Sequence, residues 1–119
     1  MNSTGSPVSV IARRADEVAS LLKVMANECR LLVLCHLVEA GELSVGELMV
    51  RLEISQSALS QHLARLREER LVATRKEAQS VFYRVDDPKA EQVLALLYRL
   101  FCPELGGLAQ PALERGGTA

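Results

Sequence analysis

Apolar residues recur at helical spacing over the first part of the chain. The stretch from Val10 to Met25 carries one apolar stripe, which predicts an amphipathic helix. The members of that stripe are Val18, Leu21, Leu22 and Met25. Asn27 is a favoured N-cap residue, so a second helix is expected from there to about Glu39, with Gly41 as its stop signal. The chain is therefore predicted to open with two helices.

Two shorter helical segments follow, separated by a tight turn. Ser44 and Glu47 have the spacing of a capping box, which predicts a helix over 44–52. Ser55 is a favoured N-cap for the next helix, which is expected over 56–69. Because so few residues lie between these two helices, the pair is predicted to form a helix-turn-helix.

Beyond Arg70 the apolar period changes from that of a helix to that of a strand. Two strands are predicted, Leu71–Lys76 and Ser80–Val85, around a turn at Glu77–Gln79. One face of the second strand carries Val81, Tyr83 and Val85. A hairpin directly after a helix-turn-helix is expected to serve as a wing.

A last helix is expected to begin at a cap on Asp86 or Asp87, with Pro88 in its first turn, and to end near Phe101. It is apolar nearly all round, with Val93, Leu94, Leu96, Leu97, Tyr98, Leu100 and Phe101. A chain of 119 residues has no interior large enough to wrap such a helix completely. We therefore predict a homodimer, built on the last helix and the first.

These elements predict a mainly α fold with a small β-hairpin: a winged helix-turn-helix of four helices, two strands and a final helix. One domain is expected over 10–102, flanked by loose tails at 1–9 and 103–119 that are rich in Ser, Thr, Gly, Pro and Ala. The polar N-terminus resembles no secretory signal, and charges interrupt every apolar run. We therefore expect a cytoplasmic location and no contact with a membrane.

Charge is distributed unevenly along the chain. The net charge is only −1, but six basic residues stand against three acidic ones between Ser55 and Val85. A basic segment on an acidic body is typical of proteins that bind a polyanion, although ordinary solvated surfaces can show the same unevenness. With apolar residues at 49% and aromatic ones at 3%, the core must consist mainly of Leu, Val and Ala.

The second helix of a helix-turn-helix enters the major groove and reads base edges. The corresponding face here carries hydrogen-bonding side chains, namely Gln56, Ser57, Ser60, Gln61 and Arg65. In the hairpin, Arg75, Lys76 and Gln79 stand where a wing would touch phosphates. A polar helix face alone is equally typical of a solvated surface, and the basic hairpin beside it favours double-stranded DNA as the partner.

Three segments carry a resemblance to a known family: Met25–Leu31, Leu43–Leu48 and Ser55–Leu63. Together they resemble the ArsR-type winged-helix repressors of bacteria. The resemblance covers about Val18–Cys102, and the third segment is specific rather than generic. It implies a dimeric transcriptional repressor whose two recognition helices read a palindromic operator.

Repressors of this family often release DNA when a metal binds. Where the arsenic and cadmium pattern has cysteines, this chain has Ser44 and Gly46. Where the zinc pattern has acid and histidine residues on the last helix, this chain has Asp87 but Lys89, and no histidine follows. Zinc needs three or four nitrogen or thiolate ligands, so no metal and no other cofactor is expected. A metal-sensing repressor is kept as an alternative.

The cysteines are the other candidate sensing groups. A cysteine among Leu and Val is usually an inert small hydrophobe, which makes a regulator with inert cysteines a second alternative. The sequence around Cys35 and Cys102, however, resembles the sulfide- and redox-responsive subgroup of the family (BigR, SqrR and HlyU type). That resemblance implies a dithiol switch in which persulfides or oxidants link the two cysteines through sulfur and the protein releases its operator. Cys29 has no counterpart in this pattern and is expected to be structural or merely exposed, with a resolving role as the alternative.

Two further classes of function compete with a DNA-binding regulator. An enzyme is disfavoured, because the chain has no C-x-x-C motif and no glycine-rich phosphate loop. A winged helix used only for protein contacts would not need Ser57, Ser60, Gln61 and Arg65 above a basic hairpin. Salt-sensitive binding to duplex DNA distinguishes these classes.

Overall fold

The computed structural model describes residues 5–104. Its elements, in chain order, are α1 (Pro7–Arg13), α2 (Ala15–Met25), α3 (Glu28–Ala40), β1 (Leu43–Ser44), α4 (Val45–Leu52), α5 (Gln56–Glu68), β2 (Val72–Glu77), β3 (Ser80–Val85) and α6 (Pro88–Phe101). The predicted succession of helix-turn-helix, hairpin and final helix is confirmed. Of the tails predicted at 1–9 and 103–119, residues 1–4 and 105–119 lie outside the described residues.

The N-terminal helix differs from the expectation in two ways. It is divided into α1 and α2 at Arg14, whose φ of −118° and ψ of 20° are not helical. It also begins at Pro7 rather than Val10, so three residues assigned to the tail are helical. The cause is a local cap: the Ser6 hydroxyl accepts a hydrogen bond from the Ser9 backbone N–H at 3.1 Å, and Pro7 occupies the first turn.

The other predicted helix ends are confirmed by their caps. The Asn27 side chain accepts from the Arg30 N–H at 3.0 Å at the start of α3. Gly41 ends that helix with a φ of +88°, a conformation that glycine adopts without steric cost. Ser44 and Glu47 form both hydrogen bonds of a capping box at the start of α4. These local contacts fix where the helices of the DNA-reading half begin.

The sheet contains one strand more than the sequence predicts. The hairpin pairs β2 with β3 in antiparallel register, Thr74 opposite Tyr83, around a turn at Ala78 and Gln79. The additional strand β1 has two residues and pairs with β3, Leu43 opposite Tyr83, so the sheet order is β1-β3-β2. So short a strand has no period of its own from which it could be predicted.

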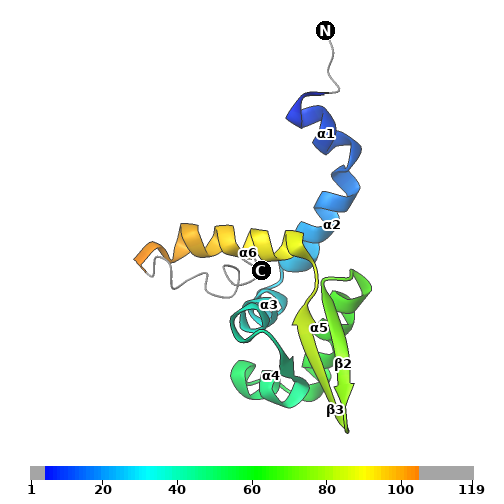
Figure 1. Cartoon of the computed structure of the whole chain (residues 1–119), viewed down its shortest axis with the longest axis vertical. Helices are drawn as coiled ribbons and strands as arrows, with labels where there is room; N and C mark the ends of the chain where they lie inside the picture. The colour runs from blue at the N-terminus through cyan, green and yellow to red at the C-terminus, as the bar shows by residue number, and fades with distance from the viewer. Residues whose placement is uncertain (1–4, 105–119) are drawn as a thin grey trace.

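The core lies where α2, α3, α4, α5, the sheet and the first turns of α6 meet. Its largest fully buried side chains are Leu34, Leu37, Leu48, Leu59, Leu63, Leu66, Leu71, Leu94, Val24 and Val33. Figure 1 shows α1 and α2 rising away from this body, α6 crossing above α3, and the hairpin descending beside α5. The molecule thus presents the helix-turn-helix and wing at one end and α1, α2 and α6 at the other.

Candidate DNA-binding surface and thiol pair

The recognition helix α5 has one buried and one exposed side. Leu59, Leu63 and Leu66 face the core, and Ser55 caps the helix by accepting from the Ala58 N–H at 3.2 Å. The four polar residues predicted to read bases are all exposed: Gln56, Ser57, Ser60 and Gln61. The leucine stripe therefore orients the polar face outward, as the sequence predicts.

Arg65 differs from these neighbours because its side chain is half-buried. Its Nε is shielded from solvent and has no hydrogen-bond partner among residues 5–104. A buried donor left without an acceptor is costly in free energy. The Nη groups of Arg65 are not shielded in this way, and a phosphate is the anion that a guanidinium suits best.

The three predicted contact residues of the wing are all exposed, but they differ in their hydrogen bonding. Lys76 and Gln79 are exposed near the hairpin tip. Arg75, in contrast, donates from Nε and Nη2 to both carboxylate oxygens of Glu42, at 2.8 and 2.9 Å, and from Nη1 to Glu77 at 2.6 Å. Its guanidinium also lies 4.6 Å from the centre of the Phe82 ring. Hydrogen bonding to Arg75 lowers the pKa of Glu42.

Cys35 and Cys102 lie on different elements of the fold, and both lie against Tyr98. Cys35 lies on α3, half-buried against the core, and Cys102 follows the last residue of α6, where its N–H donates to the Tyr98 carbonyl at 2.8 Å. Burial raises the pKa of the Cys35 thiol, and the nearby Cys102 and Glu39 raise it further. A hydrogen bond from the Tyr98 hydroxyl acts in the opposite direction. All three cysteines of the chain are free thiols.

Cys29 lies near the start of α3, partly buried against the same core. Burial raises the pKa of its thiol as well, with a smaller opposing effect from Arg30. Neither Cys35 nor Cys102 is among the charges that act on it. Cys29 therefore lies apart from the Tyr98 environment that Cys35 and Cys102 share.

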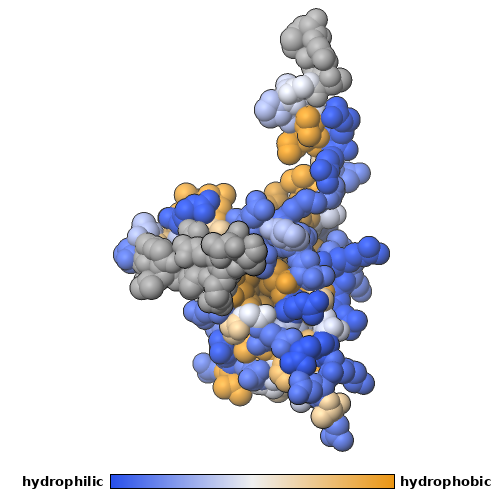
Figure 2. All heavy atoms as spheres, in the orientation of Figure 1, coloured by the Kyte–Doolittle hydropathy of each residue, from blue (hydrophilic) through white to orange (hydrophobic). Residues whose placement is uncertain are grey.

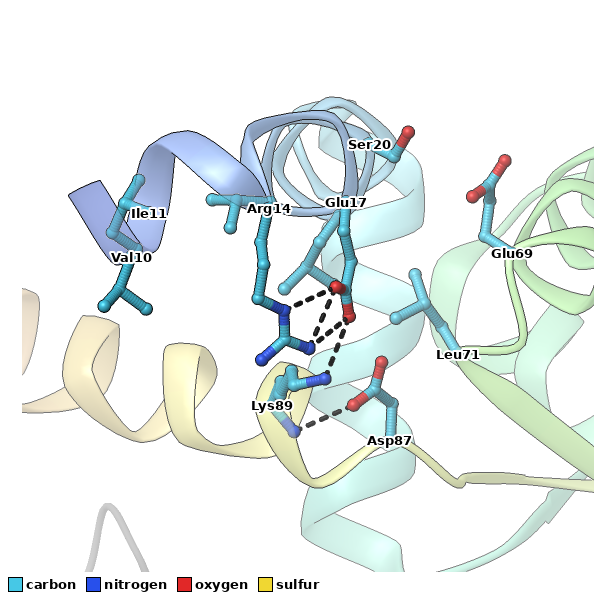
Figure 3. Close-up of a pocket in the computed structure, with 11 residues that line it drawn as sticks. Val10, Ile11, Arg14, Glu17, Ser20, Glu69, Leu71, Asp87 and Lys89 are labelled. Atoms are coloured by element: carbon cyan, nitrogen blue, oxygen red, sulfur yellow. Dashed lines mark hydrogen bonds and ion pairs between the residues drawn. The ribbon is translucent and has the colours of Figure 1, made fainter. Parts of the chain in front are cut away.

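A groove of about 510 Å³ lies between the N-terminal helices and the first turn of α6. Val10, Ile11 and Leu71 are among its apolar lining residues. Across it, Glu17 accepts hydrogen bonds from Arg14 at 2.9 Å and from the Lys89 ammonium at 3.1 Å, as Figure 3 shows. This ion pair joins α2 to α6, and the groove was not predicted from the sequence.

Apolar side chains are exposed at the same end of the molecule. They are Val8, Val10, Ile11 and Leu22 on α1 and α2, and Leu96, Leu100 and Phe101 on α6. Phe101 is 76% exposed and Leu100 is 62% exposed. Figure 2 shows apolar surface on the rising N-terminal helices and along α6. The prediction that α6 has a second apolar face is confirmed, since Leu94 and Ala95 are buried while these residues are not.

Within residues 5–104, no three or more His, Cys, Asp or Glu side chains gather in a way that could hold a metal ion. No described helix is both long and apolar enough to cross a membrane.

A helix-turn-helix followed by a two-stranded wing, with a polar outward face on its second helix, defines a winged-helix DNA-binding protein. The family model described as "Bacterial regulatory protein, arsR family" matches residues 27–74. The transcriptional activator HlyU of Vibrio cholerae is 52% identical over 100 residues, which are 82% of this chain and 92% of that protein. The chain belongs to the ArsR family of bacterial transcriptional regulators.

Other relatives agree with this assignment. The biofilm growth-associated repressor of Agrobacterium fabrum is 47% identical over 96 residues, 81% of each chain. The crystal structure of the transcriptional repressor BigR from Xylella fastidiosa has a TM-score of 0.77 and 44% identity, covering 82% of this chain and 98% of that one. HlyU and BigR are members of the sulfide- and redox-responsive subgroup that the sequence resembles. The prediction of a regulator rather than an enzyme is thereby confirmed.

Proposed function

We propose that the protein is a homodimeric repressor that binds a palindromic operator and releases it when Cys35 and Cys102 become linked through sulfur. The observation that carries this proposal is that Tyr98 lies against both cysteines: its hydroxyl hydrogen-bonds the Cys35 thiol on α3, and its carbonyl accepts from the Cys102 N–H at 2.8 Å at the end of α6. One thiol belongs to the core beneath the recognition helix, and the other ends the helix with the unpartnered apolar face. A bond between them would join the sensing chemistry to both functional ends of the molecule.

The DNA-binding part of the proposal rests on α5 and the hairpin. Gln56, Ser57, Ser60 and Gln61 are exposed on the outer face of α5, with side chains that can donate to and accept from base edges. Arg65 lies half-buried on the same helix with Nη groups that are not shielded, and Lys76 and Gln79 are exposed on the adjoining wing. This combination supports insertion of α5 into the major groove, with phosphates held on either side.

The dimer part rests on the apolar surface of α1, α2 and α6. Large exposed apolar side chains that gather on one surface are typical of protein interfaces. The groove beside Val10 and Ile11 offers further area that a second copy would cover. A two-fold dimer built there would place two α5 helices on the same side of the assembly, as a palindromic operator requires.

Linking the two cysteines is an oxidation and needs an electron acceptor. Linking two thiols removes two electrons and two protons from the pair. For a direct disulfide, a hydrogen polysulfide accepts both electrons and both protons as one of its S–S bonds breaks, and the two fragments leave as hydrogen sulfide and a sulfide chain one sulfur shorter. If sulfane sulfur is retained between the cysteines, the bridge is longer and tolerates a wider gap than the roughly 7 Å between Cα atoms that a direct disulfide allows.

The proposed consequence for DNA is mechanical. A bridge would tie α3, which packs on α4 and α5, to the C-terminal end of α6, which we place in the dimer interface. The spacing of the two recognition helices would then change. A coupling of about 1–3 kcal/mol would weaken operator binding roughly 5–150-fold.

The test is DNA binding by the reduced and the polysulfide-treated protein. The probe is the promoter region upstream of the protein's own gene, and mass spectrometry follows the cysteine peptides. We expect wild type to lose affinity on treatment, while Cys35→Ser and Cys102→Ser bind DNA but do not respond. Cys29→Ser is the matched control and should respond as wild type does. A response that survives in Cys35→Ser would overturn the thiol switch.

One observation favours a second candidate. Burial raises the pKa of Cys35, which disfavours the reactive thiolate at neutral pH and suits a regulator with inert cysteines. That candidate expects operator binding that polysulfide leaves unchanged, with no mass increase on Cys35 or Cys102. The same experiment therefore separates the two candidates.

A further inference from the structure

Arg75 is the most heavily engaged cation in the described part of the wing. It makes three hydrogen bonds to two carboxylates and stacks over Phe82. Glu42 receives two of these bonds as a bidentate pair, the arrangement that the guanidinium fork makes best. No interaction of this kind joins Lys76, the next residue, to any side chain in residues 5–104.

Glu42 and Arg75 belong to distant parts of the chain. Glu42 lies between Gly41, which ends α3, and β1, which leads directly into the helix-turn-helix. Arg75 lies on β2, and the hydrogen bonds between the two residues span 33 positions in the sequence. The pair therefore ties the hairpin to the segment that enters α4.

The charges argue against a direct phosphate contact. Two carboxylates surround the Arg75 guanidinium, and Arg84 is the further charge that acts on Glu42, so two positive and two negative charges leave no net positive charge here. A phosphate approaching Arg75 would have to displace Glu42 or be repelled by it. Glu42 is the better-held carboxylate, since it is 30% exposed and bonded through both oxygens, whereas Glu77 is 68% exposed and accepts one hydrogen bond.

We propose that Arg75 is a positioning residue, a clamp that sets the wing against the helix-turn-helix, and that it does not contact DNA. The inference deepens the proposed DNA-binding function and rests on it. The clamp consists of Arg75, Glu42 and Glu77, with Phe82 beneath the guanidinium. Lys76 then supplies the phosphate contact that the sequence alone would assign equally to both residues.

The experiment measures the affinity of the reduced protein for a fluorescent duplex from its own promoter region, at several KCl concentrations. Each protein–phosphate contact contributes about 0.9 to the slope of log K against log[salt]. We expect Lys76→Gln to lower that slope by about 0.9. Arg75→Gln and Glu42→Gln should each weaken binding about two- to fivefold, the effect of an exposed ion-pair network, without changing the slope.

Two further variants sharpen the test. Arg75→Lys keeps a positive charge for a phosphate but loses the fork that holds Glu42, so a clamp predicts that it behaves as Arg75→Gln does. The double variant of Arg75→Gln with Glu42→Gln should bind no more weakly than either single variant, because both remove the same contact. A lower slope in Arg75→Gln, restored in Arg75→Lys, would overturn the inference, as would tighter binding by Glu42→Gln.

Amide hydrogen exchange, measured without DNA, tests the clamp independently of the proposed DNA binding. Amide hydrogen exchange in β2 and β3 should quicken in Arg75→Gln and Glu42→Gln and stay unchanged in Lys76→Gln. Unchanged exchange in all three variants would overturn the clamp. Wild-type protein without any salt-dependent DNA affinity would overturn the proposed function instead, whatever the exchange shows.

Discussion

Cys35 is a thiol whose reactivity is determined by its neighbours. Burial raises its pKa, with smaller contributions from Cys102 and Glu39, and the Tyr98 hydroxyl opposes them. Because the thiolate is the nucleophile, a raised pKa slows reaction at neutral pH. The proposed switch therefore rests on the place of Cys35 beside Tyr98 and the end of α6, rather than on an intrinsically reactive thiol.

Alkylation of Cys35 by iodoacetamide should be slower in the folded protein than in the unfolded chain at pH 7. The rate should rise about tenfold per pH unit and continue to rise beyond pH 9, because the thiolate fraction grows until pH passes the raised pKa. Tyr98→Phe should raise the pKa further by removing a hydrogen bond that favours the thiolate. Mass spectrometry of the Cys35 peptide measures both effects. Faster alkylation in the folded state would contradict the assigned environment.

Residue-scale roles could be predicted only where they depend on local sequence. The outward face of α5 follows from the leucine spacing, and the exposure of Gln56 and Gln61 agrees with it. The partner of Arg75 could not be predicted, because Glu42 is 33 positions away in the sequence and nothing in either segment indicates the other. The same holds for Tyr98 beside Cys35, which requires α6 to cross α3.

Helix ends were predicted well because their causes are local. Asn27, Ser44 and Ser55 each cap a helix with a side chain that accepts from an N–H three residues ahead. The division at Arg14 was missed, since neither glycine nor proline marks it. The start of α1 could have been found, because Ser6 followed by Pro7 is a helix-start signal.

At the scale of elements, the capping box of α4 gives a prediction. Ser44→Ala should lower the free energy of unfolding by about 0.5–2 kcal/mol, because the Glu47 N–H loses its acceptor at the helix start. Urea unfolding followed by circular dichroism measures the change. Ser60→Ala, on the exposed face of α5, is the control and should remain within about 0.5 kcal/mol of wild type. Equal stability of both variants would contradict the role of the cap.

The whole molecule has two ends with different surfaces. The DNA-reading end presents polar side chains on α5 and the wing, and the opposite end presents apolar ones on α1, α2 and α6. The ion pair of Glu17 with Lys89 joins α2 to α6 at that second end. A single copy of the chain leaves this apolar end in water, which is why we propose a dimer there.

Leu100→Glu should shift the protein from dimer to monomer in analytical ultracentrifugation, because the charge would be buried in the proposed interface. Operator affinity should fall as well, because a monomer would contact only one half-site. Val50→Glu, an equally drastic change at a residue 78% exposed on α4, is the control for oligomeric state and should remain dimeric. A dimer that persists in Leu100→Glu would place the interface elsewhere.

The two-residue strand β1 has a consequence for how a signal can travel. Its pairing with β3, Leu43 opposite Tyr83, closes a loop in the chain that contains all of α4 and α5. The strand before α4 and the strand after α5 are therefore both hydrogen-bonded to β3, which constrains the recognition helix from both sides in the chain. A displacement of α3 or α6 that moved α5 alone would break the β1–β3 pairing. We therefore expect the recognition helix and the wing to move together as one unit.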